Sequence, residues 1–412
     1  MLSFRRRATR DAGVRAWFSR RWKLVGASGL VLVLALAGIG FYAWRKPSRP
    51  FELEAAIPVS APEFNLALFQ SLGARMLPGH ELSLLENGSV FDGVAAEVAA
   101  ARSSIHVLMY IWEKGAASDR LTRALVGRAR AGVACRVLVD DLGSPDFAKD
   151  VQPALTQAGC DVRIFRPTSE EKVARNHRKI LIFDGRTAVT GGFGVRDDWL
   201  GDGVHQESWR DTNVRFAGPA VAEAQQAFAE NWQEAGGSLL PAEAFPSLTG
   251  AGPAEAAFVS SSGAPVLTRA DRLVQVMLAA ATKRLWITNA YFVPSLGIEH
   301  LLTRKADQGV DVRVLVAGKK SDSKTSFGIQ QTEYDRLRAH GVRIWEYQPS
   351  MLHAKSIVVD DDLLLVGSIN LEPLSLRTLE EGALVARDRE VAAALMRAFG
   401  EDCKHATELT GK

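Results

Sequence analysis

Short runs rich in Val, Ile and Leu alternate with longer segments whose apolar residues recur at helical spacing. In the first half of the chain, the strand-like runs lie at 104–112, 135–141, 161–165, 177–185 and 188–192. Helix-periodic segments at 119–133 and 153–160 separate the first three of these runs, and each has a glycine close to its end. Such alternation predicts an α/β fold in which neighbouring strands are mainly parallel, in a parallel or mixed sheet flanked by helices.

The second half of the chain repeats this order. Its strand-like runs lie at 284–294, 311–318, 343–347, 353–361 and 363–368, with helix-periodic segments at 298–310 and 334–342. One repeat of this length predicts two similar lobes related by pseudo-twofold symmetry. The stretch 236–256 is rich in Gly, Pro and Ala, which is typical of a boundary. We therefore place the lobes at 62–245 and 246–412.

An uncharged apolar run at 24–44 is long enough to cross a bilayer as a helix. The leader at 1–23 carries eight Arg and Lys residues, whereas the tether at 45–61 carries only Arg45, Lys46 and Arg49. This bias predicts a single-pass anchor that leaves the amino terminus in the cytoplasm and the bulk of the chain on the extracytoplasmic side.

Two other interpretations of this run compete with the anchor, and a third is poor. Ala35-Leu36-Ala37 could be a signal-peptidase site, and Ser19-Arg20-Arg21 weakly resembles a twin-arginine signal. A buried core helix fits poorly, because the run is apolar throughout and lies at the end of the chain. The favoured interpretation stays an uncleaved anchor.

Composition narrows the function only a little. The chain has 412 residues, 47% hydrophobic and 24% charged, with a net charge of +3, which is a usual globular mixture. So small a basic excess does not favour a nucleic acid as partner. The three cysteines contain no Cys-x-x-Cys pair, so a thiolate zinc site is not expected. Cys135 and Cys160 precede strand-like runs, and we expect two buried thiols rather than a disulfide.

Each half contains the pattern His-x-Lys-x-x-x-x-Asp. The two copies are His177, Lys179 and Asp184, and His353, Lys355 and Asp360. Each copy is followed by a turn of small residues, Gly191-Gly192 in the first half and Gly367-Ser368 in the second. Residues i and i+2 of a strand face the same side, so each histidine projects together with its lysine. Two symmetric lobes could bring both pairs to one cleft.

Two imidazoles and two ammonium groups suit a phosphodiester substrate. The lysines would stabilise charge on the non-bridging oxygens, which requires no metal and no other cofactor. One neutral imidazole would attack phosphorus and form a phosphohistidine. The other, protonated, would donate to the leaving oxygen and then deprotonate the acceptor. The two histidines should therefore titrate as a coupled pair.

With these motifs, the chain after residue 60 resembles the phospholipase D superfamily, and within it the bacterial cardiolipin synthases. The stretches that carry the closer resemblance are 209–221, 289–294, 309–323, 341–360 and 367–377.

The resemblance implies a role for each motif residue. His177 would be the nucleophile and His353 the general acid and base, while Lys179 and Lys355 bind phosphate. Asp184 and Asp360 complete the catalytic motifs, and we expect them to brace the turns. The residues implied to bind or orient the substrate are Asp211 and Glu381, as partners of the ring nitrogens, and Ser368, Asn370 and Gly192, which line the site.

The chain departs from the family pattern at several positions. Gly194 stands where Asn is usual, and Asn213 where His is frequent. After the second motif, Asp, Arg and Asn are replaced by Glu372, Leu374 and Leu379. The loop at 194–209 carries Trp199 and Trp209, and either lipid contact or ordinary packing would explain them.

The resemblance implies a membrane-anchored phosphatidyltransferase that makes cardiolipin from two molecules of phosphatidylglycerol. Three alternatives remain: a phospholipase D with water as acceptor, a nuclease of the same superfamily, and an inactive member that only binds anionic lipid. The intact His-Lys pairs argue against the last, and the near-neutral charge argues against the nuclease.

Overall fold

The computed structural model describes residues 36–38, 57, 59, 63–169, 174–205, 208–248, 250–264 and 267–410. The predicted leader, nearly all of the predicted anchor and most of the tether lie outside these residues. Within the described ranges, no helix has the length and apolarity needed to cross a bilayer. The chain divides into compact units at 1–48 and 49–412, and the description below concerns the second unit.

The first half of this unit begins with two elements that the sequence patterns did not indicate, α2 (Glu63–Leu72) and β1 (Leu77–Glu86). The next elements are α3 (Ser89–Ala100), β2 (Ser104–Met109), α4 (Ala116–Arg130), β3 (Ala134–Asp140), α5 (Phe147–Asp150), α6 (Gln152–Gln157) and β4 (Asp161–Phe165). The half closes with β5 (Ile180–Phe183), β6 (Thr187–Gly191), the 3-10 turn η1 (Asp197–Trp199), β7 (Thr212–Ala217) and α7 (Ala220–Glu234).

The second half follows the same plan. It contains β8 (Ala254–Ser261), α8 (Arg269–Ala280), β9 (Arg284–Asn289), α9 (Leu296–Asp307), β10 (Asp311–Ala317), α10 (Lys324–Gln330), α11 (Tyr334–Ala339) and β11 (Arg343–Tyr347). It ends with β12 (Lys355–Val359), β13 (Leu363–Gly367), α12 (Pro373–Arg377), β14 (Glu381–Arg387), α13 (Arg389–Lys404) and β15 (Ala406–Glu408). The predicted strand runs of both halves coincide with strands of the structure.

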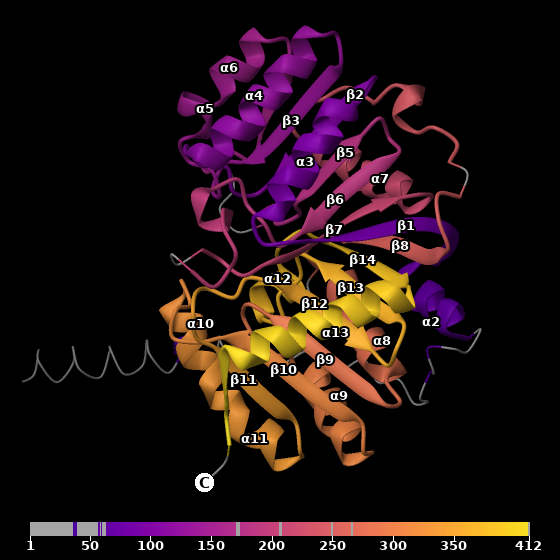
Figure 1. Ribbon diagram of the computed structural model, residues 1–412, viewed down its shortest axis with the longest axis vertical. Coiled ribbons are helices and arrows are strands. Elements are labelled where there is room, and N and C mark those ends of the chain that lie inside the picture. The colour runs from indigo at the N-terminus through magenta and orange to yellow at the C-terminus, as the bar shows by residue number, and fades with distance from the viewer. Residues whose placement is uncertain are drawn as a thin grey trace, which may run out of the picture. The chain divides into compact units, whose positions relative to one another are not determined.

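The strands form one hydrogen-bonded series whose order is nearly a palindrome. It runs β15-β11-β10-β9-β12-β13-β14-β8-β1-β7-β6-β5-β2-β3-β4. Apart from the edge strand β15, each strand of one half has its counterpart at the mirrored place, and β1 pairs with β8 at the centre. The duplication seen in the sequence is therefore a duplication of topology (Figure 1).

The expectation of mainly parallel pairing is wrong. Among the described strands, only the neighbours β2–β3, β3–β4, β9–β10 and β10–β11 are parallel. The other pairings are antiparallel, because each histidine motif runs into a hairpin, β5–β6 or β12–β13, instead of a crossover helix. The sheet is therefore mixed, with parallel strands only where a helix connects them.

The two halves share a hydrophobic core. One cluster of buried side chains draws on β5, β6, β7 and α7 of the first half and on β12, β13, β14 and α13 of the second. Phe216 and Phe258 stack there with ring centroids 6.1 Å apart. In Figure 1, α13 lies across the strands of the second half. The shared cluster holds both motif-bearing hairpins in one fixed arrangement.

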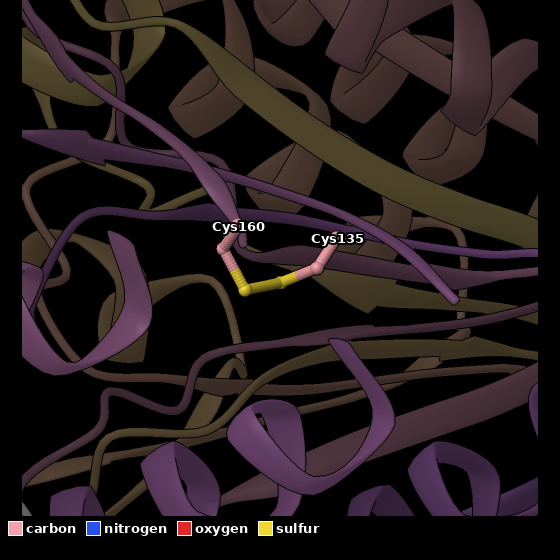
Figure 2. The surroundings of a disulfide bond; sticks show 2 residues. All are labelled: Cys135 and Cys160. Atoms are coloured by element: carbon pink, nitrogen blue, oxygen red, sulfur yellow. A yellow bond between two sulfur atoms is a disulfide. The ribbon is translucent and has the colours of Figure 1, made fainter. Parts of the chain in front are cut away.

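Cys135 and Cys160 form a disulfide, contrary to the expectation of two buried thiols (Figure 2). Cys135 begins the buried part of β3, and Cys160 directly precedes β4, which pairs in parallel with β3. Their Cα atoms are 4.6 Å apart. The register that sets Arg136 opposite Asp161 brings the two preceding residues side by side, and residue spacing alone could not reveal this register.

Candidate active site

Short backbone bridges carry each histidine across to the other half of the molecule. The amide of His177 donates to the carbonyl of Glu380 at 2.8 Å. The amide of Glu380 donates in turn to the carbonyl of Arg175 at 2.9 Å. The second copy repeats this geometry, because the amide of His353 donates to the carbonyl of Arg210 at 2.7 Å. Each motif is therefore fixed against the segment that follows the other motif.

These bridges set each imidazole beside an acid of the opposite half. His177 Nδ1 lies 2.9 and 3.1 Å from the two carboxylate oxygens of Glu381. His353 Nδ1 lies 3.2 Å from an oxygen of Asp211. An ionised acid at Nδ1 favours the tautomer that carries hydrogen there, which leaves Nε2 with a free lone pair. The sequence indicated these two acids but not which ring each would hold.

The two acids differ in their surroundings. Glu381 accepts hydrogen bonds from the Ser368 hydroxyl and, at 2.5 Å, from the Ser375 hydroxyl. Burial alone would raise the pKa of Glu381, but His177, Lys179 and Ser368 together hold that pKa below its ordinary value.

Asp211 accepts from the Trp199 indole at 2.7 Å and from the Thr212 amide at 2.8 Å. Burial raises the pKa of Asp211 to about 6, although Lys355 and Trp199 oppose this. The two histidine–acid pairs therefore hold their protons unequally, although the backbone around them is symmetric.

Both motif lysines are buried and turn back toward their own histidines. Lys179 Nζ donates to the carbonyl of His177 at 2.7 Å, and Lys355 Nζ donates to the carbonyl of His353. Burial lowers the pKa of Lys179 to about 7 and the pKa of Lys355 to about 8. A bound phosphodiester anion would stabilise the charged form of both lysines.

Burial also lowers the pKa of both imidazoles. For His177 the charge of Glu381 opposes this effect, whereas for His353 the charges of Lys355 and Lys179 add to it. Both shifts favour the neutral form of each ring in the empty site. An imidazole must be neutral to attack phosphorus, and an anionic phosphodiester would favour protonation of the other ring.

The motif aspartates occupy the turns. Asp184 accepts from the amides of Ser103 and Ser104 at 2.7 and 2.9 Å, at the start of β2. Asp360 accepts in the same way from the amides of Lys283 and Arg284 at 2.7 and 3.0 Å, at the start of β9. Both aspartates have positive φ, 54° and 52°. These contacts tie each hairpin to the neighbouring strand, as expected of braces.

A cavity of about 340 Å³ exposes both histidines. Its described lining is Tyr110, Ile111, His177, Arg196, Trp209, Tyr291, Asp322, Ser323, Ser326, His353, Asn370, Glu372, Leu374 and Leu379. Gly192 lies behind this wall, where a Cβ atom would come 2.5 Å from an Asp211 oxygen, so no side chain fits there. Ser368 lies behind it as well, fully buried against Glu381.

Three of the departures from the family pattern, Glu372, Leu374 and Leu379, line this cavity. Gly194 lies outside the lining, and a Cβ there would meet Ile111 and Trp199 at 3.0 Å. Asn213 caps the backbone by accepting from the Phe193 amide at 3.2 Å. Three of these five departures from the family pattern therefore lie in the cavity wall, and the other two lie in segments that pack behind it.

Aromatic residues around the histidines were not predicted as site residues. The Tyr110 ring lies 5.1 Å from the His177 ring, and the Trp199 ring lies 5.2 Å from the His353 ring. Trp209 also packs on His353, and Trp199 is completely buried. The loop that carries both tryptophans therefore packs on the site, which favours ordinary packing over lipid contact for them. Tyr110 lies within the strand-like run 104–112 and directly follows β2, and this position was its signal in the sequence.

No group of three or more His, Cys, Asp or Glu side chains in the described ranges is arranged to hold a metal ion.

A duplicated mixed α/β unit that places two His-x-Lys strand ends at one cavity, with each ring held by an acid of the other half, defines the class of phospholipase D-like proteins. Comparison with known proteins agrees. A family model described as "Cardiolipin synthase, PLD-like domain" matches residues 94–232 and 274–403, more than half of the chain.

The chain belongs to this family of cardiolipin synthase-type, phospholipase D-like enzymes. It is 32% identical to cardiolipin synthase A of Pseudomonas entomophila over 82% of this chain and 71% of that protein. It is 30% identical to cardiolipin synthase 1 of Bacillus anthracis over 88% and 74%. A crystal structure of phosphatidylserine synthase from Haemophilus influenzae matches with a TM-score of 0.65 at 15% identity, covering 84% and 92%. The resemblance stated from the motifs is thereby confirmed.

Proposed function

We propose that this enzyme transfers a phosphatidyl group from one phosphatidylglycerol to a second, releasing glycerol and forming cardiolipin. The observation that carries the proposal is the pair of oppositely anchored histidines that open on one cavity beside two buried lysines. Relatives named cardiolipin synthase, at 32% and 30% identity, support this substrate class.

The first chemical step would use His177 as nucleophile. Its Nε2 lone pair forms a bond to phosphorus, and the bond from phosphorus to the glycerol oxygen breaks. The leaving oxygen takes the proton from Nε2 of His353. Glu381 supports the positive charge that develops on the His177 ring, and the lysines stabilise the non-bridging oxygens.

The second step reverses these roles for a new alcohol. His353, now neutral, removes the proton from the acceptor hydroxyl, and the acceptor oxygen attacks phosphorus. The bond between phosphorus and His177 then breaks, which restores both rings to their starting states. Water in place of the alcohol would give phosphatidic acid through the same intermediate.

Lipid mass spectrometry of the products tests the proposal. The full chain is incubated with phosphatidylglycerol in mixed micelles containing a chelator, beside His177→Ala. We expect cardiolipin and glycerol from the parent chain and none from the variant. Phosphatidic acid as the only product would make the enzyme a hydrolase, and an unchanged lipid pool would contradict a phospholipid substrate.

We further propose that the enzyme is anchored in the bacterial inner membrane by residues 24–44, with the catalytic unit on the outer side. The disulfide between Cys135 and Cys160 supports this orientation, because disulfides persist in oxidising compartments and not in the cytosol.

Thiol labelling of cells denatured directly in maleimide tests this orientation. Before reduction, a maleimide under denaturing conditions should label only Cys403, the one free thiol of the described residues. After reduction, two further sites should react. Replacing Cys135 and Cys160 by Ser should lower the free energy of unfolding by about 3 kcal/mol, given the loop that the bond closes. Three reactive thiols in cells without reduction would contradict the proposed side.

A further inference from the structure

One wall of the cavity carries polar groups that the two-histidine mechanism does not use. Asp322, Ser323, Ser326 and Glu372 all come from the second half of the chain. Among the described lining residues, the first half contributes Tyr110, Ile111 and Trp209, together with His177 and one charged residue, Arg196. The two halves of the chain therefore contribute different groups to the cavity wall.

The carboxylates of the polar wall are held in place. Asp322 accepts the Tyr291 hydroxyl at 2.7 Å, and the Tyr291 ring lies edge-on to His353 at 6.3 Å. Glu372 accepts the amides of Leu374 and Ser375 at 2.6 and 2.7 Å, at the start of α12. Each carboxylate oxygen has two lone pairs, so both acids retain capacity to accept hydrogen bonds from a ligand.

Asn370 supplies an independent sign of a missing ligand. This residue lines the cavity and is only 2% exposed. Its amide oxygen has no hydrogen-bond partner among the described residues. Buried polar atoms are rarely left unpaired, so a bound molecule that donates a hydrogen bond at this place would complete the site.

The surrounding charges indicate which donor fits. Asp322 lies close enough to Lys355 to interact with its charge, and Arg196 does so with His353. Lys355 therefore already offsets Asp322, and burial raises the pKa of Glu372 to about 7, which weakens its charge. An ammonium group would gain little net attraction there, whereas neutral hydroxyls would find three acceptors.

We propose that Asp322, Glu372 and Asn370 form the acceptor subsite, and that it recognises neighbouring hydroxyls of a polyol headgroup. One hydroxyl of the acceptor would face His353 and react, while the next would donate to the acids. This inference rests on the proposed transfer reaction. It identifies the part of the cavity that selects the acceptor alcohol.

A competition between three alcohols of one carbon skeleton tests the subsite. The full chain is given phosphatidylglycerol with equal amounts of propan-1-ol, propane-1,2-diol and 2-aminopropan-1-ol, which differ only at the second carbon. The three phosphatidyl products are then quantified in the same tube. The second hydroxyl of the diol can donate one hydrogen bond to a charged acceptor, and one such bond lowers the barrier to transfer enough to change the rate about tenfold. We therefore expect the diol to be preferred over propan-1-ol by about tenfold.

Asp322→Ala should reduce this preference to about twofold or less, and Glu372→Gln should reduce it in the same direction. The ratio of products is measured within one reaction, so a general loss of folded enzyme does not change it. Asp335→Ala is the matched control, because Asp335 lies on α11 with a 94% exposed side chain. It should leave the ratio unchanged.

Two results would overturn the subsite and leave the transfer reaction standing: equal use of the diol and propan-1-ol, or a ratio that neither variant alters. Preference for the amino alcohol would also overturn it, in favour of a cationic headgroup. If no phosphatidylglycerol is consumed, the proposed function itself fails, and the subsite fails with it.

Discussion

At the scale of single residues, symmetry of the backbone does not bring symmetry of charge. His177 faces Glu381, which also accepts two serine hydroxyls, and His353 faces Asp211, which accepts from a tryptophan indole and a backbone amide. The pKa of one acid is lowered, and the pKa of the other is raised to about 6. This difference gives a physical basis for assigning different roles to two residues that occupy equivalent places.

The motif lysines should make activity sensitive to alkaline pH. The folded-state pKa of Lys355 is lowered to about 8 and that of Lys179 to about 7. Each lysine therefore loses its charge as pH rises through these values, and kcat/KM of the free enzyme should fall between about pH 7 and 9.

Lys355→Arg keeps its charge throughout this range, since arginine does not deprotonate. In this variant only Lys179 should still lose its charge in this range. The alkaline fall of kcat/KM should therefore follow the titration of Lys179 alone, even if the maximum rate is lower. Lys355→Met should lose rate at every pH, by on the order of 10²-fold or more. A pH–rate profile that is identical for the parent chain and the arginine variant would show that Lys355 does not titrate there.

At the scale of elements, the repeated hairpins depend on their aspartates. Asp360 accepts three backbone amides and a hydroxyl from the segment 282–284. Those donors would be left unpaired without the carboxylate, at a cost for each buried group.

Asp360→Ala should therefore lower the free energy of unfolding by about 2–4 kcal/mol, measured by urea denaturation. Its neighbour Asp361 offers a control, because within the described residues its side chain is half exposed and forms ion pairs with Lys283 and Arg284 at 3.7 and 3.5 Å. Asp361→Ala should cost less than about 1 kcal/mol. Equal losses in the two variants would contradict the bracing role.

At the scale of the whole molecule, the shared core couples the two halves. Phe258 of β8 stacks on Phe216 of β7, and Leu364 and Leu384 of the second half belong to the same buried cluster. The halves should therefore unfold together instead of as separate domains.

Phe258→Ala should lower the free energy of unfolding by about 3–5 kcal/mol. Hydrogen exchange should then show faster opening of buried amides in β6 as well as in β13. A loss of protection confined to the second half would show that the halves are independent, and would favour the boundary predicted at 245/246 as a true domain border.

The site was more predictable than the sheet that carries it. The duplicated motif indicated both histidines and both lysines, because chemistry of this kind needs particular residue types at regular spacing, and the family resemblance implied the acids Asp211 and Glu381. Strand direction depends on which segments pair, and apolar runs carry no record of that. The excess of antiparallel pairs, and elements such as α2, β1, β7, β8 and β14, therefore became visible only in the folded chain.

The sequence by itself determined the duplication, the chemical groups of the two motifs and the family, since all of these are properties of residue order. The tertiary structure decided which acid holds which ring, that Cys135 meets Cys160, and that Trp199 lies buried against His353. These facts depend on contacts between segments as much as 204 positions apart. Such contacts arise from strand register and shared burial, which no local pattern of residues specifies.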